Sequence, residues 1–169
     1  TGEMPGNYIC NLAHVRSGFW ELFRDQILPR IIAEALASFA PYIKARYPQE
    51  TIFETFVSSL MQSRGDYGGH DVHNHHYHDP TFVATILIYL DTVSDGHQGT
   101  TLLKTREGVD EASGAAQTLR WHDLTEEEKT IEYRPGRIFA FYDNPIAYHA
   151  VNPSMPGAMF GRRILRLHL

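Results

Sequence analysis

The pattern of apolar and polar positions divides the chain into a helical N-terminal part and a strand-rich remainder. Residues 1–16 show no sustained period, and we expect a loop or a short edge strand there. From residue 17 to residue 46, apolar side chains recur at helical spacing, with Ser17 as a candidate N-cap and Pro29 as a candidate kink. This pattern predicts one kinked helix, or two short ones, packed against an apolar surface.

Beyond residue 47 the pattern favours short strands. Residues 85–90 are all either apolar or β-branched, which is typical of a strand buried on both faces. The segment 53–63 fits a helix and a strand equally well. The sequence Thr-Glu-Glu-Glu from Thr125 fits a capping box and predicts a short turn of helix. Three further strands are predicted, at residues 137–143, 148–151 and 162–169.

These elements predict an α+β fold. At 169 residues the chain has the length of one domain with a substantial core, so we expect a single domain over residues 1–169. Residues 17–46 would form a helical layer on one sheet, and residues from about 53 to 169 a small barrel or a double-sheet jelly roll.

Charge and cysteine content narrow the class of partner. The net charge is −5 without basic clusters, so we infer neither a nucleic acid nor a membrane surface as partner. Cys10 is the single cysteine and cannot form an intrachain disulfide, which fits a reducing compartment; we expect a cytoplasmic protein. No apolar run approaches the ~18–20 residues of a transmembrane helix. The expected partner is a small molecule or a peptide, and the oligomeric state stays open.

Histidines supply the candidate chemistry. Five of the ten lie within residues 70–78, and imidazole is the commonest protein ligand for transition metals. Residues two apart on a strand point to the same side, so His76 and His78 could bind one metal ion, and His73 and His75 have the same spacing. His149 is the candidate third ligand. Three ligands on one side leave positions open for substrate, co-substrate or O2. Four histidines are expected to be ordinary surface or core residues: His14, His97, His122 and His168.

The segment His76–Leu90 resembles the metal-binding strand of the Fe(II)/2-oxoglutarate-dependent oxygenases, in particular the prolyl-hydroxylase-like members. These read His-x-Asp, then Pro, then Thr or Ser, then an apolar stretch that ends in Tyr-Leu. The resemblance continues, in the family's order, through four further segments: Gly99–Leu102, Pro135–Phe141, Tyr148–Val151 and Gly161–Leu167. It covers about residues 67–169.

The resemblance implies a double-stranded β-helix that binds Fe(II), with 2-oxoglutarate as co-substrate and O2 as oxidant. His76 and His149 match the two iron histidines. Tyr89 matches a tyrosine that hydrogen-bonds the distal carboxylate of 2-oxoglutarate. Arg162 matches the arginine that pairs with this carboxylate, and Arg163 is the alternative one residue later.

The sequence departs from the family at His78, where the metal carboxylate is expected. Either His78 binds the metal, or Asp79 does so after a local bulge, or no protein group fills the position and chloride could take it. The ligand pair could also be His73 and His75. With three neutral imidazoles the centre would be one unit more positive than in the family.

We therefore expect an oxygenase that hydroxylates an unactivated C–H bond of an unidentified substrate. Tyr67 is the candidate residue lining the substrate pocket. Two alternatives stay open: a three-histidine cupin-type dioxygenase that works without 2-oxoglutarate, and a non-catalytic metal-binding relative.

Overall fold

A computed structural model of the chain describes residues 2–4, 7–10, 17–49, 56–63, 70–75, 79–90, 99–105, 125–151 and 163–169. The helical part is continuous: α1 (Gly18–Leu22), the π-helical turn η2 (Phe23–Ile27) and α2 (Leu28–Arg46) follow one another without a break. The Ser17 hydroxyl accepts a hydrogen bond from the Trp20 amide at 3.1 Å, which confirms the predicted N-cap. Within these ranges, no helix combines the length and apolarity needed to cross a membrane.

The strands form two antiparallel sheets, which confirms the α+β class. The six-stranded sheet has the order β1 (Gly2–Met4), β2 (Asn7–Cys10), β3 (Phe56–Ser63), β10 (Arg163–His168), β5 (Ala84–Tyr89) and β8 (Ile138–Tyr142). The four-stranded sheet has the order β4 (His70–His73), β9 (Tyr148–Val151), β6 (Thr100–Thr105) and β7 (Thr125–Ile131). In this arrangement residues 56–63 of the ambiguous segment 53–63 form a strand, β3.

The helical turn predicted at Thr125 is wrong, because this segment is β7. The strand pairs with β6, in register Lys104 with Glu126 and Leu103 with Glu127. Lys104 Nζ lies 3.0 Å from a carboxylate oxygen of Glu126 across this pair. Pairing with a neighbouring strand has overridden the local capping signal, as tertiary context commonly does for short segments.

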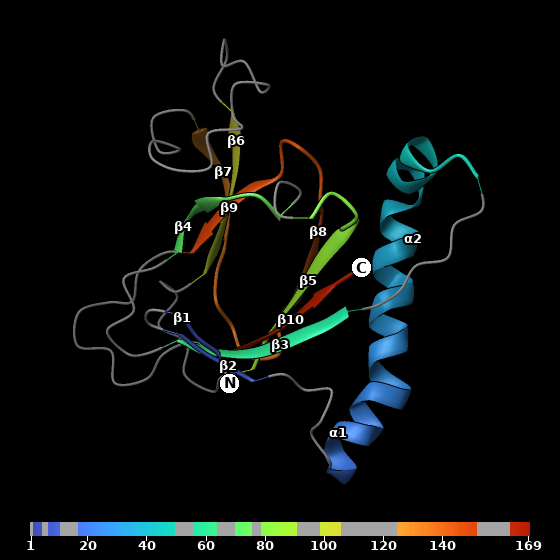
Figure 1. Cartoon of the computed structure of the whole chain (residues 1–169), viewed down its shortest axis with the longest axis vertical. Helices are drawn as coiled ribbons and strands as arrows, with labels where there is room; N and C mark the ends of the chain where they lie inside the picture. Colours follow the sequence, from blue (N-terminus) through green and yellow to red (C-terminus); the bar gives the residue numbers. More distant parts are fainter. Residues whose placement is uncertain are drawn as a thin grey trace.

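One face of the six-stranded sheet packs against the helices. Figure 1 shows α2 along one side of β5, β10 and β3, with the four-stranded sheet on the other side. The buried cluster between helices and sheet contains Trp20, Leu28, Ala35, Ala84, Ile86, Ile88, Leu165, Leu167 and Leu169. The predicted helical layer on one sheet is therefore present.

The opposite face of this sheet is turned to the four-stranded sheet. A second apolar cluster lies there, and Leu102 of β6 and Ile131 of β7 pack against it; its buried members are Leu87, Tyr89, Tyr133, Phe141 and Ile164. Because strand residues alternate between faces, Thr85 shares this inner face with Leu87 and Tyr89. Arg166 and His168 share it with Ile164.

Arg46, the last residue of α2, ties the helix to the ends of two strands. Its guanidinium donates to the carbonyl oxygens of Phe82 at 3.2 Å and Asp143 at 3.0 Å, and also to that of Pro80. Phe82 precedes β5, and Asp143 follows β8. Arg46 of α2 therefore fixes the position of the start of β5 and of the end of β8.

The helix-side cluster generates a prediction for stability. Leu167 is fully buried, whereas Leu90 is 45% exposed. Leu167→Ala should lower the free energy of unfolding by about 2–5 kcal/mol, because it removes buried methyl groups and leaves a cavity. The matched variant Leu90→Ala should cost about 1 kcal/mol or less. Urea unfolding followed by far-UV circular dichroism checks both values. Equal losses would contradict the assignment of this core.

Candidate metal centre

A β-bulge brings His73 opposite His149. The strands β4 and β9 pair His70 with Val151 and His73 with His149, so two residues of β4 lie opposite one residue of β9 between these pairs. A bulge of this kind shifts the side chains that follow it to the other face of the strand. His73 and His149 are therefore direct cross-strand neighbours, with ring centroids 4.1 Å apart.

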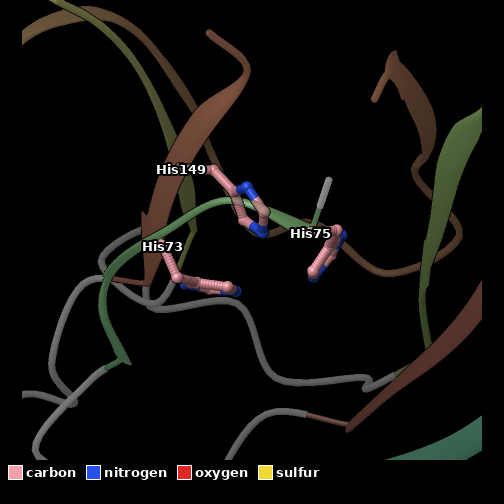
Figure 2. A group of neighbouring side chains, drawn as sticks. All are labelled: His73, His75 and His149. Atoms are coloured by element: carbon pink, nitrogen blue, oxygen red, sulfur yellow. The ribbon is translucent and has the colours of Figure 1, made fainter. Parts of the chain in front are cut away.

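His75 completes the group just beyond the end of β4. Its ring centroid lies 4.5 Å from that of His149 and 5.2 Å from that of His73. Each of the three histidines offers a ring nitrogen, and these atoms lie within 4.8 Å of one another. Figure 2 shows the three rings turned toward a common space. His75 and His149 are buried and His73 is partly exposed, so the group can be reached from the His73 side.

Hydrogen bonds hold the turn that carries His75. The side chain of Asn74, which is buried, donates from Nδ2 to the Asn144 carbonyl at 2.9 Å. The Asp79 amide donates to the His75 carbonyl at 2.9 Å. Asn74 is thus anchored to the loop between β8 and β9. The rings of His73 and His75, on either side of it, point to the same space.

Behind His75 lies a buried polar cluster centred on the Thr85 hydroxyl. This hydroxyl donates to Asp143 Oδ2 at 2.6 Å and lies 2.9 Å from His75 Nδ1 and 3.0 Å from His168 Nδ1. Asp143 is completely buried. Among the described residues its Oδ1 has no hydrogen-bond partner, and this atom lies 3.6 Å from His75 Nδ1.

His75, Asp143 and His168 form a second group of close ligand atoms within the described part of the chain. The Thr85 hydroxyl, however, contacts all three of these side chains at hydrogen-bond distance. A metal ion bound by them would need the space that this hydroxyl fills, because metal–nitrogen bonds are only about 2.0–2.1 Å long. The group of His73, His75 and His149 is therefore the better candidate for a metal.

His168 is kept neutral by its surroundings. Burial, together with the nearby His75 and Arg166, lowers its pKa to about 3, while Asp79 acts in the opposite direction. The Phe82 ring stacks on His168 with centroids 4.4 Å apart. A neutral imidazole fits a role as hydrogen-bond partner to Thr85.

Several residues singled out in the sequence lie outside the described ranges, namely Tyr67, His76, His78 and Arg162. Their assignments stay predictions. What the structure brings together is the alternative pair, His73 and His75, with His149.

Three other candidates can be placed. Tyr89 is buried on the inner face and its hydroxyl donates to Thr100 Oγ1 at 2.9 Å. Arg163 is exposed, and by strand alternation it lies on the face opposite to Ile164 and Arg166. Asp79 accepts hydrogen bonds from the Thr81 hydroxyl and amide at 2.6 and 2.9 Å, which hold the pKa of its carboxyl below the usual value. The Asp79 carboxylate thus closes a turn, and it does not belong to the group of ligand atoms formed by the three histidines.

Sequence reasoning missed the residues behind the site. Thr85, Arg166 and His168 are polar residues that alternate with buried apolar residues in β5 and β10. In a strand buried on both faces, a polar residue needs a specific partner, and this requirement was the available signal. Asp143 carried no comparable signal, because it follows the end of β8.

No family model matches the chain, and no curated protein matches it either. Among solved structures, the chain is similar to an oxidoreductase of the 2OG-Fe(II) oxygenase family from Burkholderia pseudomallei, with 12% sequence identity and a TM-score of 0.42. The match covers 70% of this chain and 46% of that chain, so this chain spans about half of that protein's length. At this TM-score we draw nothing about function from the likeness.

The three histidines fit a divalent transition metal. Neutral imidazole nitrogens suit iron, zinc, copper and nickel, and three ligands leave coordination positions open on the exposed side. The unsatisfied oxygen of Asp143 also fits, because a buried carboxylate is costly unless positive charge lies near it. A cation bound to His75 would provide that charge.

The geometry predicts which histidines bind metal. His73→Ala, His75→Ala and His149→Ala should each weaken Zn(II) binding by more than about 100-fold, since even contacts behind a ligand are worth 10–100-fold. Competition with a chromophoric chelator measures the affinity. His97→Ala, a histidine assigned to no site, is the matched control and should bind as the wild type does. Loss of binding in His76→Ala and His78→Ala, with His73→Ala and His75→Ala unaffected, would instead support the first ligand pair.

Proposed function

We propose that this chain is a non-haem Fe(II)- and 2-oxoglutarate-dependent oxygenase that uses O2 to hydroxylate a C–H bond. The observation that carries the proposal is the group of His73, His75 and His149, whose ring nitrogens lie within 4.8 Å of one another. His73 and His75 would take the place that the family resemblance first assigned to His76 and His78.

The strand order supports a double-stranded β-helix as the fold. The strands β3, β10, β5 and β8 form four neighbours in one sheet, and β4, β9, β6 and β7 form the other. Along the chain, β3 to β6 alternate between the sheets, as do β7 to β10. Such alternation is expected when two Greek-key hairpins wind into a double-sheet jelly roll. The metal centre would lie between the sheets, at the end of β4.

Arg166 is the arginine we propose for the distal carboxylate of 2-oxoglutarate. It lies opposite Leu87 on β5, while its neighbour Ile164 lies opposite Tyr89, so Arg166 and Tyr89 are diagonal neighbours on the inner face. Burial lowers the pKa of the Arg166 guanidinium from its ordinary value. A guanidinium removed from water in this way suits a bidentate pair with a carboxylate. Arg163 faces the other side of the sheet.

A cavity beside the histidines is the proposed place for the substrate. It measures about 310 Å³, and its lining includes Leu102, Phe141, Ile146 and Ala147, with Lys104 and Glu128 as charged members. The Phe141 ring packs against His149 with centroids 4.7 Å apart, so the cavity adjoins the metal centre. The lining favours a largely apolar group near the reacting position.

At such a centre, iron, 2-oxoglutarate and O2 would supply the oxidising chemistry, in which decarboxylation to succinate and CO2 accompanies conversion of C–H to C–OH. The protein's own residues have three tasks. The histidines hold the metal, Arg166 and Tyr89 orient the co-substrate, and the apolar cluster around Phe141 keeps water from the interior.

A three-histidine dioxygenase that works without 2-oxoglutarate is the second candidate. The observation that favours it is the ligand set itself, which contains no carboxylate among the three described residues. The two candidates differ in whether 2-oxoglutarate binds, and this difference can be measured.

The co-substrate assignment predicts a contrast between two arginines of β10. With metal-loaded protein, 2-oxoglutarate should raise the melting temperature of the wild type and of Arg163→Leu. Arg166→Leu should bind it roughly 10–150-fold more weakly, because charge-assisted hydrogen bonds contribute about 1.5–3 kcal/mol. Thermal shift titrations measure this affinity, and succinate release measures turnover.

Each outcome of this experiment decides between candidates. If Arg166→Leu responds to 2-oxoglutarate as the wild type does, Arg166 is not the carboxylate ligand. If the wild type itself shows no response, the dioxygenase without 2-oxoglutarate is favoured. If iron supports no O2 uptake under any condition while Zn(II) binds tightly, the chain is a non-catalytic metal-binding relative.

A further inference from the structure

We infer that Thr85 and Asp143 are positioning residues for His75: they orient its ring so that Nε2 faces the metal, and they supply negative charge behind it. This inference rests on the proposed metal centre. Neither residue belongs to the three-histidine group.

The protons around Thr85 can be assigned from its hydrogen bonds. A threonine hydroxyl has one proton to donate and two lone pairs to accept with. Its shortest contact is the 2.6 Å hydrogen bond that it donates to Asp143 Oδ2, so its one proton is used there. The hydroxyl must therefore accept from the ring nitrogens of both His75 and His168, at 2.9 and 3.0 Å.

The hydrogen bonds of the Thr85 hydroxyl determine the tautomer of His75. A ring that donates from Nδ1 carries its proton there and keeps the lone pair on Nε2, which is the form that binds a metal through Nε2. The ring orientation is also determined, because Thr85 and Asp143 both approach from the Nδ1 side. Hydrogen positions follow here from the heavy-atom distances alone.

The Asp143 carboxylate also bears on the charge of the proposed metal centre. Three imidazole ligands leave a divalent ion without a neutralising carboxylate, which is the consequence of having His75 where the family has an acid. Asp143 Oδ1 lies 3.6 Å from His75 Nδ1, so a carboxylate lies on the side of the His75 ring that faces away from the proposed metal. Its negative charge acts on the metal through the His75 ring, as carboxylates behind zinc-bound histidines do.

A purely structural role for the cluster leaves one observation unexplained. A buried polar group that serves only packing is expected to have its hydrogen bonds satisfied. Thr85, His75 and His168 meet this expectation, but Asp143 Oδ1 has no hydrogen-bond partner among the described residues. Its position beside His75 is accounted for when the His75 ring carries part of a cation's charge.

The first test uses the unaltered protein without metal. Two-bond ¹H–¹⁵N spectra of the imidazole rings report which nitrogen carries the proton, and His75→Gln and His168→Gln assign the signals. Both rings should be protonated at Nδ1. A His75 ring with its proton on Nε2 would overturn the inference, whatever the protein does with iron.

The second test uses Zn(II) affinity and conservative variants. Thr85→Val keeps the shape but removes the hydroxyl, and Asp143→Asn keeps the shape but removes the charge; each should weaken Zn(II) binding by about 10–100-fold. Thr85→Ser restores the hydroxyl and should restore both the affinity and the His75 spectrum. Thr101→Val is the matched control, because Thr101 is also a buried strand threonine but its hydroxyl contacts that of Thr130 at 3.0 Å.

These results separate the inference from the function on which it rests. If Zn(II) binding depends on His73, His75 and His149, but Thr85→Val and Asp143→Asn bind as tightly as the wild type, the positioning role is overturned and the metal centre stands. If no metal binds through the three histidines, the proposed function fails as well. If Thr85→Val does not fold, Asp143→Asn and the wild-type ring spectra decide the question.

Discussion

The pairing of β5 with β10 is the constraint on which the rest of the structure depends. In this register Thr85 lies opposite His168, and Leu87 lies opposite Arg166. Alternation then sends every second side chain of both strands to the helices and the others to the four-stranded sheet. A shift of one residue would turn the polar side chains toward α2 and the leucines toward the histidines. Core and candidate site are therefore specified by the same register.

The two faces of this strand pair have opposite energetic roles. On the helix side, burial of leucines and isoleucines stabilises the fold. On the inner side, a buried carboxylate, a buried imidazole and a guanidinium lose hydration, which is unfavourable unless they find partners. Arg46 connects the two sides, because it holds the carbonyls of Phe82 and Asp143 from the end of α2. The apolar layer thus supports a polar cluster that would be unstable alone.

Sequence reasoning predicted the elements better than the site. The helix over residues 17–46 and the strands of the C-terminal part followed from periodicity, because those segments are long or strongly apolar. The pairs His73-x-His75 and His76-x-His78 have identical spacing, and the family resemblance favoured His76 and His78, which lie outside the described residues. What brings His73 opposite His149 is a bulge between His70 and His73, a long-range property of the pairing with β9. Asp143 and Thr85 are 58 residues apart, and nothing local shows that they meet.

The position of Asp143 bears on why a histidine can stand where a carboxylate is expected. A metal centre between two sheets needs negative charge to offset the ion, but that charge need not bind the ion directly. A carboxylate 3.6 Å behind His75 acts at longer range, and the low dielectric of a fully buried position keeps its effect strong. In the proposed centre His75 would fill one coordination position as an aspartate would, so the number of open positions would be the same. The three histidines would then hold the metal, and Asp143 behind His75 would supply the negative charge.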